Sequence, residues 1–153
     1  MNEPVVIREG AATDEYPRLV EIWRTAVDST HDFLAEVDRA TIEEKLPTDY
    51  LPNVRLAVAE RAGLAVGFAG TADGDLAMLF THADQRGSGV GSALLHHVIR
   101  SHKVSTVDVN EQNEQAVSFY RHFGFEIVSR SPIDAGGLPY PLLHMKLPET
   151  PLP

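Results

Sequence analysis

Cysteine is absent from the 153-residue sequence, and positive charge is scarce. Without cysteine the chain can form neither disulfide bonds nor thiolate metal sites, and it cannot use a cysteine nucleophile. Thirteen lysines and arginines stand against 22 aspartates and glutamates, which gives a formal net charge of −9. Such an acidic balance argues against a nucleic-acid backbone or an anionic membrane as the main partner.

Long apolar runs are missing as well. No run approaches the roughly 18 residues that a membrane-spanning helix needs. The N-terminal segment MNEPVVIREG has no apolar core of the signal-peptide kind, so we expect a cytoplasmic protein. With 43% hydrophobic and 23% charged residues, the chain has the composition of one globular domain. Its length is sufficient to bury a core without disulfides or metal.

Hydrophobic periodicity predicts a mixed α/β protein. Helices are expected over residues 14–28, 34–46, 90–102 and 113–122, and strands over 5–8, 54–58, 64–68, 76–81, 106–110, 125–130 and 140–147. The second helix should stop at Pro47. Because hairpins and crossover helices occur in the same chain, we expect a single mixed sheet with helices on both faces. We assign residues 1–147 to this domain and 148–153 to a proline-rich tail.

A glycine-rich segment, Gln85-Arg86-Gly87-Ser88-Gly89-Val90-Gly91, connects a predicted strand to a predicted helix. At such a junction the backbone N–H groups and the positive end of the helix dipole point at one place, which suits a phosphate group. Glycine lets the anion approach the backbone without a Cβ in the way, and Arg86 can add a direct charge. The plainer interpretation is a tight turn between two elements.

Three kinds of phosphate loop are candidates. A nucleoside-triphosphatase loop requires a lysine, which this segment lacks. A dinucleotide loop is matched imperfectly by Gly87 and Gly89, with Asp108 about 20 residues on, where a ribose-binding acid belongs. Against it, the preceding half of the chain offers hairpins rather than a βαβ unit. The third candidate is a loop that binds the pyrophosphate of an acyl-CoA.

A second group of side chains lies on the helix predicted over 113–122. Asn113 and Tyr120 are seven residues apart, so they project from one face of the helix with the small Ala116 between them. Such a stripe can line the binding site of a polar, amide-containing ligand. Alternatively, Asn113 caps the helix and Tyr120 is a core residue whose hydroxyl lies at the edge.

Together these two motifs resemble those of the Gcn5-related N-acetyltransferase (GNAT) superfamily. Residues 86–91 match its [Arg/Gln]-x-x-Gly-x-[Gly/Ala] signature, and Asn-x-x-Ala-x-x-x-Tyr at 113–120 is similar to its second motif. Segments that closely resemble the bacterial YjaB-type acetyltransferases are 27–34, 109–117 and 139–143. The resemblance covers most of the chain, from residue 6 to residue 147. It implies the acyl-CoA N-acyltransferase fold, in which a mixed sheet is splayed between its fourth and fifth strands to admit the cofactor.

The resemblance also implies acetyl transfer from acetyl-CoA to an amine, without a metal. The cofactor-binding residues implied in this way are Leu79, Phe80, Thr81, Arg86, Gly87, Ser88, Gly89, Val90, Gly91, Ser92, Asn113 and Tyr120. The strand residues among them would hold the pantetheine arm through their backbone, and the loop would hold the pyrophosphate. Tyr120 would donate a proton to the departing thiolate, because a phenol near pKa 10 facing a thiol near 8.5 is only about 2 kcal/mol uphill.

Candidates for the acceptor side come from two connections in the chain. They are His31 and Asp32, between the first two helices, and Asp134 and Tyr140, ahead of the last strand. Plainer interpretations make Asp32 a helix cap and His31 a loop residue. The remaining histidines, including the pair His96 and His97, lack the i, i+4 spacing of a helical metal site, so we expect them at the surface.

No cysteine can carry the acetyl group, so direct attack by the amine in a ternary complex is expected. The acceptor is a small amine, a protein lysine or a protein N-terminus, and the sequence does not choose among them. Two alternatives remain: a non-catalytic acyl-CoA sensor, and a nucleotide-binding module that uses Gly87, Gly89 and Asp108. A homodimer is one option for the oligomeric state.

Overall fold

The computed structural model describes residues 3–30 and 32–148. In this part of the chain seven strands form one sheet, in the spatial order β1-β2-β3-β4-β5-β7-β6. The strands are β1 (Val6–Glu9), β2 (Arg55–Arg61), β3 (Leu64–Ala72), β4 (Asp75–Thr81), β5 (Thr106–Asn110), β6 (Glu126–Ser131) and β7 (Leu142–Lys146). The helices are α1 (Tyr16–Thr30), α2 (Glu36–Lys45), α3 (Val90–Ser101) and α4 (Glu114–His122). The predicted order of elements is confirmed.

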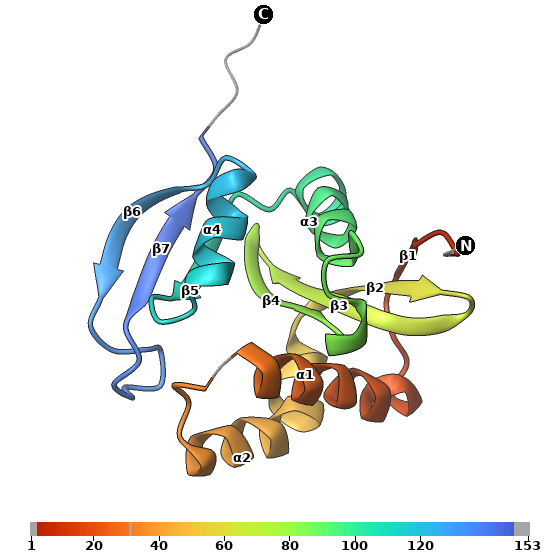
Figure 1. Ribbon diagram of the computed structural model, residues 1–153, viewed down its shortest axis with the longest axis horizontal. Helices are drawn as coiled ribbons and strands as arrows, with labels where there is room; N and C mark the ends of the chain where they lie inside the picture. The colour runs from red at the N-terminus through yellow and green to blue at the C-terminus, as the bar shows by residue number, and fades with distance from the viewer. Residues whose placement is uncertain (1–2, 31, 149–153) are drawn as a thin grey trace, which may run out of the picture.

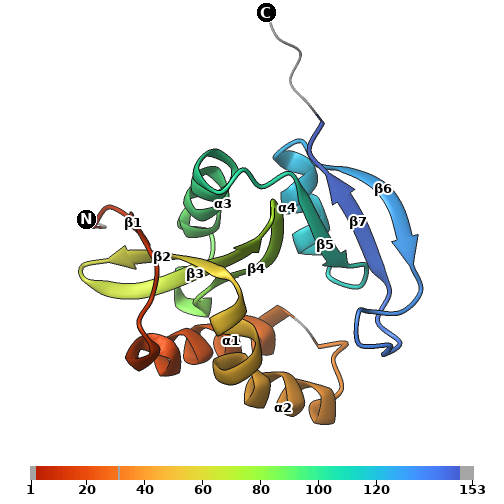
Figure 2. The ribbon, with the colours of Figure 1, turned by 180° about the vertical axis from the view of Figure 1, so that it is seen from behind.

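Helices cover both faces of the sheet, as predicted (Figures 1 and 2). On one face α1 packs with an apolar stripe that includes Leu19 and Trp23, which meet Phe68 of the sheet. On the other face α3 and α4 enclose a second apolar cluster, in which Leu94 packs with Val107. The sheet therefore separates two cores. One core packs α1 and α2 against the sheet, and the other packs α3 and α4 against it.

Strand β3 lies between the two cores, and its residues from Ala65 to Thr71 are all buried. Gly67 in this strand allows helix α3 to approach the sheet closely. A Cβ at Gly67 would lie 2.7 Å from Val90 Cγ1, closer than any side chain can come. Because Val90 is the first residue of α3, this contact sets the position of the helix N-terminus.

Strands β4 and β5 separate soon after they begin. They are parallel, and their register joins Asp75 with Thr106 and Leu76 with Val107. Strand β5, in contrast, pairs with β7 over its whole length from Thr106 to Asn110. The two halves of the sheet therefore diverge along β4, and the splay expected between the fourth and fifth strands is confirmed (Figure 1).

Helix α2 ends at Lys45, just before Pro47, so the expected stop of this helix is confirmed. The chain nevertheless continues as a π-helix (Leu46–Tyr50) and a 3-10 turn (Leu51–Asn53). A proline in the first turn of this next helical segment loses no required N–H. Residues 149–153 of the predicted tail lie outside the described residues. Among the helices that are described, none is both long enough and apolar enough to cross a membrane.

Candidate active site

A cleft of about 690 Å³ opens where β4 and β5 diverge. This volume is within the usual range for small-molecule sites. The predicted cofactor-binding residues that line the cleft are Leu79, Phe80, Thr81, Arg86, Gly87, Gly89, Val90, Gly91, Ser92, Asn113 and Tyr120. Ser88 differs from these, since its hydroxyl donates to the carbonyl of Gln85 at 2.5 Å and braces the loop. The structure thus brings the two sequence motifs together around one cavity.

The glycine loop has a backbone that favours glycine at two positions. Gly87 has φ of +74° and Gly89 has φ of +90°, both in the left-handed region. A Cβ at either position would meet no atom of the described chain within 4 Å, so the space above the loop is open. Because α3 begins at Val90, its first N–H groups have no acceptor within the helix and point toward that space. This cradle fits a pyrophosphate.

Two arginines flank the loop. Arg86 lies on the rim of the cleft, where its Nη2 donates to Gln115 Oε1 at 2.5 Å and so connects the loop to α4. Arg61, at the end of β2, donates from Nη2 to the carbonyl of Ser88 at 3.3 Å. Sequence reasoning missed Arg61, because only the folded sheet brings its hairpin beside the loop. The Arg86 guanidinium adds positive charge where an anion would bind, whereas Arg61 holds the backbone of the loop.

Asn113 caps α4. Its side-chain oxygen accepts the backbone N–H of Ala116 at 3.2 Å, which satisfies one of the free donors at the helix N-terminus. The capping interpretation is confirmed, and the cap orients the first turn of α4 toward the cleft that Asn113 and Ala116 line. A direct bond from Asn113 to the cofactor stays a prediction.

Tyr120 both packs in the core and lines the cleft. The residue is 7% exposed, and its ring lies against Phe119 and Phe125 at centroid distances of 5.2 and 5.7 Å. Burial raises the pKa of the Tyr120 hydroxyl above its ordinary value of 10. No described residue hydrogen-bonds to this hydroxyl. The group is therefore a neutral proton donor at the edge of the cavity.

The described acceptor-side candidates lie apart from this cleft. Tyr140 donates from its hydroxyl to the carboxylate of Asp38, and the same oxygen accepts the N–H of Ala35 at 3.0 Å. These bonds fasten the connection before β7 to the start of α2, and the bond to Asp38 raises the pKa of Tyr140. Asp134 Oδ1 accepts the N–H groups of Gly136 and Leu138, each at 2.9 Å, within its own loop.

Asp32 is exposed in the connection between α1 and α2, and His31 lies outside the described residues. None of the three described candidates lines the 690 Å³ cavity. Their part in acceptor recognition stays a prediction.

A hydrogen-bonded chain of three side chains was missed by sequence reasoning. His144 Nδ1 lies 2.7 Å from Asp108 Oδ1, and His144 Nε2 lies 2.6 Å from Ser131 Oγ. The three residues come from the adjacent strands β5, β7 and β6. Asp108 also lines the cleft, so the chain starts at its wall. Asp108 was considered as a ribose-binding acid, but its carboxylate is bonded to His144 instead.

The expectation that the remaining histidines lie at the surface is wrong for His102. This residue is 7% exposed, and its Nδ1 lies 2.7 Å from Thr71 Oγ1 of β3. The backbone leaves α3 at His102 and turns back toward the sheet, which buries the imidazole. Sequence spacing did not reveal this, because the partners of His102 lie far away in the chain.

Comparison with known proteins agrees with this geometry. Residues 22–147 match the family model described as Acetyltransferase (GNAT) domain. The peptidyl-lysine N-acetyltransferase YjaB of Salmonella typhimurium is 43% identical over 136 residues, which cover 88% of this chain and 93% of that protein.

Solved structures agree as well. The solution structure of apo-form YjaB from Escherichia coli has a TM-score of 0.84 at 39% identity and covers 94% of this chain and 97% of that chain. The PaiA N-acetyltransferase of Thermoplasma acidophilum, solved in complex with coenzyme A, has the same fold, with a TM-score of 0.71 at 16% identity and coverage of 94% and 99%. With the splayed sheet, the glycine loop and the cleft between them, these matches show that the chain belongs to the GNAT family of acetyltransferases.

Proposed function

We propose that this protein transfers the acetyl group of acetyl-CoA to lysine side chains of proteins. Membership of the acetyltransferase family supports the reaction, and the relatives named peptidyl-lysine N-acetyltransferases support the acceptor. The observation that carries the proposal is the cleft itself. It is lined on one side of the sheet by the glycine loop and Tyr120, and on the other side by Ala26 and Thr30 of α1 and by Asp108. Two substrates can therefore meet in the gap from opposite faces.

Acetyl-CoA supplies the acetyl group as a thioester, and the chain's own residues hold the cofactor. The N–H groups at the start of α3, with Arg86 beside them, would bind the pyrophosphate. Backbone groups of β4 from Leu79 to Thr81 would bind the pantetheine arm, since β5 has moved away from this part of the strand. Asn113 would contact the same arm from the start of α4.

Tyr120 would act as the general acid. Its hydroxyl is neutral, lines the cleft and has no bond to a described residue that would have to be broken. It can donate its proton to the sulfur as the thiolate leaves.

The Asp108–His144–Ser131 chain would act as the general base. A lysine ammonium must lose a proton before it can attack, because only about one part in 2,500 is neutral at pH 7. Asp108 is the member of this chain that lines the cleft, so its carboxylate would receive the amine proton. The Nδ1–H of His144 donates to Asp108 at 2.7 Å and orients it, and Ser131 holds the other ring nitrogen at 2.6 Å.

Acid and base would thus act from opposite faces of the splayed sheet. Tyr120 comes from the face covered by α3 and α4. Asp108 and His144 are on the other face, because their strand neighbours Val107 and Met145 point into the core beneath those helices. This arrangement favours direct transfer within one ternary complex.

An acceptor panel tests the lysine assignment. The protein is incubated with acetyl-CoA and a lysine peptide, the same peptide with arginine in place of lysine, or a small alkylamine. We expect acetylation of the lysine peptide at a kcat/KM well above that of the alkylamine, and none of the arginine peptide. Faster transfer to the alkylamine would reject a protein acceptor while leaving acetyl transfer intact. Binding of acetyl-CoA without transfer to any amine would favour the alternative of a non-catalytic acyl-CoA sensor.

The base is tested separately with Asp108→Asn. We expect kcat at pH 7 to fall by about 10²-fold, the lower end for general acid–base catalysis. Arg130→Gln serves as the matched control. Arg130 precedes Ser131 in β6, and its guanidinium pairs with Glu111 outside the hydrogen-bonded chain. An unchanged kcat in the Asp108 variant would show that this carboxylate is not the base.

A cytoplasmic location, the lack of nucleic-acid and membrane partners, and a homodimer remain predictions. The absence of cysteine and the net charge of −9 support the first two.

A further inference from the structure

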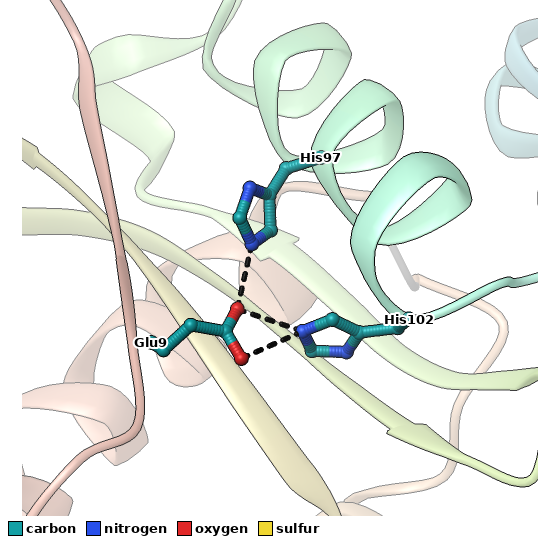
Figure 3. A group of neighbouring side chains, drawn as sticks. All are labelled: Glu9, His97 and His102. Carbon is teal, nitrogen blue, oxygen red and sulfur yellow. Dashed lines mark hydrogen bonds and ion pairs between the residues drawn. The ribbon is translucent and has the colours of Figure 1, made fainter.

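Three side chains converge at the C-terminal end of α3, away from the acetyl-transfer cleft. Glu9 is the last residue of β1, His97 is in the last two turns of α3, and His102 directly follows that helix. His97 Nε2 lies 2.6 Å from Glu9 Oε2, and His102 Nε2 lies 2.7 Å from the same oxygen (Figure 3). One donor atom from each residue lies within 4.8 Å of the other two.

The surroundings hold two of these groups in a fixed orientation. The His102 side chain is 1% exposed, and its Nδ1 lies 2.7 Å from Thr71 Oγ1, which leaves Nε2 directed at Glu9. Histidines that bind metals usually have such a partner on the second ring nitrogen, which fixes the ring and its tautomer. Arg55 binds the other carboxylate oxygen, with its Nη2 2.8 Å from Glu9 Oε1. Oε2 is therefore the oxygen turned toward both imidazoles.

We propose that Glu9, His97 and His102 form a binding site for a zinc ion. Two imidazole nitrogens and one carboxylate oxygen are a zinc ligand set, with a water as the fourth ligand. Calcium and magnesium prefer ligands that are all oxygen, so the two nitrogens select against them. The site also lies at the C-terminal end of a helix, where the backbone dipole favours a cation.

Only a small movement is needed to admit the ion. Zinc–ligand distances of about 2.0–2.2 Å at tetrahedral angles require roughly 3.4 Å between ligand atoms. The present separations of 2.6 and 2.7 Å must therefore widen by less than an ångström. The two imidazole nitrogens lie within 4.8 Å of one another and must approach by at most about 1.4 Å. The Glu9 side chain is 43% exposed at the end of an edge strand, so its Oε2 can shift while Arg55 keeps its bond to Oε1 and His102 stays in place.

The site is separate from the transfer chemistry. His97 lies seven residues beyond Val90, which is about 10 Å along the helix from the end that faces the cleft. A bound ion would join β1 to α3 and would stabilise the fold without taking part in the reaction. The proposal therefore does not depend on the acetyl acceptor or on Tyr120.

Calorimetry and thermal unfolding test the proposal. Protein without an affinity tag is stripped with a chelator and titrated with zinc chloride, with magnesium chloride as a parallel control. We expect one zinc per chain and, at a zinc concentration 100 times the Kd, a rise in Tm of about 5–10 °C. Magnesium should produce no rise.

Variants of the proposed ligand residues test where the zinc ion binds. His97→Ala and Glu9→Gln should each weaken zinc binding by at least about tenfold. His96→Ala, on the neighbouring exposed residue of α3, should bind zinc as the wild type does. Since both ligand variants are compared with and without zinc, a lower Tm of the zinc-free protein does not obscure the result. Absence of a zinc-dependent shift in the wild type, or equal binding by His97→Ala, would overturn the site and leave a hydrogen-bonded cluster only.

Discussion

Replacement of Tyr120 by phenylalanine separates a catalytic hydroxyl from a packing ring. The ring contacts with Phe119 and Phe125 are retained in the variant. Because no described residue hydrogen-bonds to the hydroxyl, its removal should change the free energy of unfolding by less than about 0.5 kcal/mol. For a chain of this size that corresponds to a shift in Tm of less than about 2 °C. The affinity for acetyl-CoA should stay nearly constant.

Turnover should fall in the same variant. General acid catalysis contributes about 10²–10⁴-fold, and burial raises the pKa of Tyr120, which makes it a weaker donor. We therefore expect the lower end, about 10²-fold in kcat, or about 2.7 kcal/mol in activation free energy. The assay follows CoA release in single-turnover reactions, where chemistry limits the rate. With a thioester whose thiol is more acidic, the variant should lose less of the wild-type rate, because that thiolate leaves more readily without a proton. Equal single-turnover rates for wild type and variant would refute the assignment of Tyr120 as the acid.

Three further predictions follow from the geometry of the cleft. Gly89→Val should cost the fold roughly 1–2 kcal/mol in unfolding free energy, because Gly89 has a left-handed backbone. The loss of CoA binding free energy measured by calorimetry should be much larger, and unchanged affinity would reject the phosphate loop. Above pH 10 the unfolding free energy of the wild type should fall relative to that of Tyr120→Phe by up to about 1.4 kcal/mol per pH unit. The reason is that Tyr120 loses its phenolic proton in the unfolded chain and keeps it in the folded one. Unfolding free energies from denaturant titrations that coincide for the two proteins would contradict this. Gly67→Ala should cost about 1–3 kcal/mol in unfolding free energy and also weaken CoA binding, because the new Cβ at 2.7 Å from Val90 displaces the start of α3; unchanged unfolding would show that α3 is free to move.

The cofactor side of the site could be predicted from sequence because its signals are local. Gly87 and Gly89 stand at a strand–helix junction, and Asn113 and Tyr120 are spaced along one helix. In each case the spacing alone brings the groups onto one face or one loop. The fold followed from the same local patterns, since hairpins and crossover helices limit the possible sheets.

The remaining groups depend on strand register and on chain reversal. Asp108 meets His144 only because β5 and β7 are antiparallel with these two residues opposite one another. Glu9 meets His102 across 93 positions of sequence, after the chain has crossed the whole first half of the sheet. No periodicity along the chain encodes such pairs. The place where β4 and β5 separate is likewise a property of the folded sheet, because apolar residues continue along both strands.

The central claim is that the splayed cleft transfers an acetyl group from acetyl-CoA to a lysine amine. It is tested most directly by one single-turnover experiment in which the protein, acetyl-CoA and a lysine peptide are mixed, quenched and measured by mass spectrometry. We expect one acetyl group on the lysine Nε for each CoA released, at a rate that falls about 10²-fold in Tyr120→Phe. Release of CoA without an acetylated peptide, or tight binding of acetyl-CoA with no CoA release, would contradict the account.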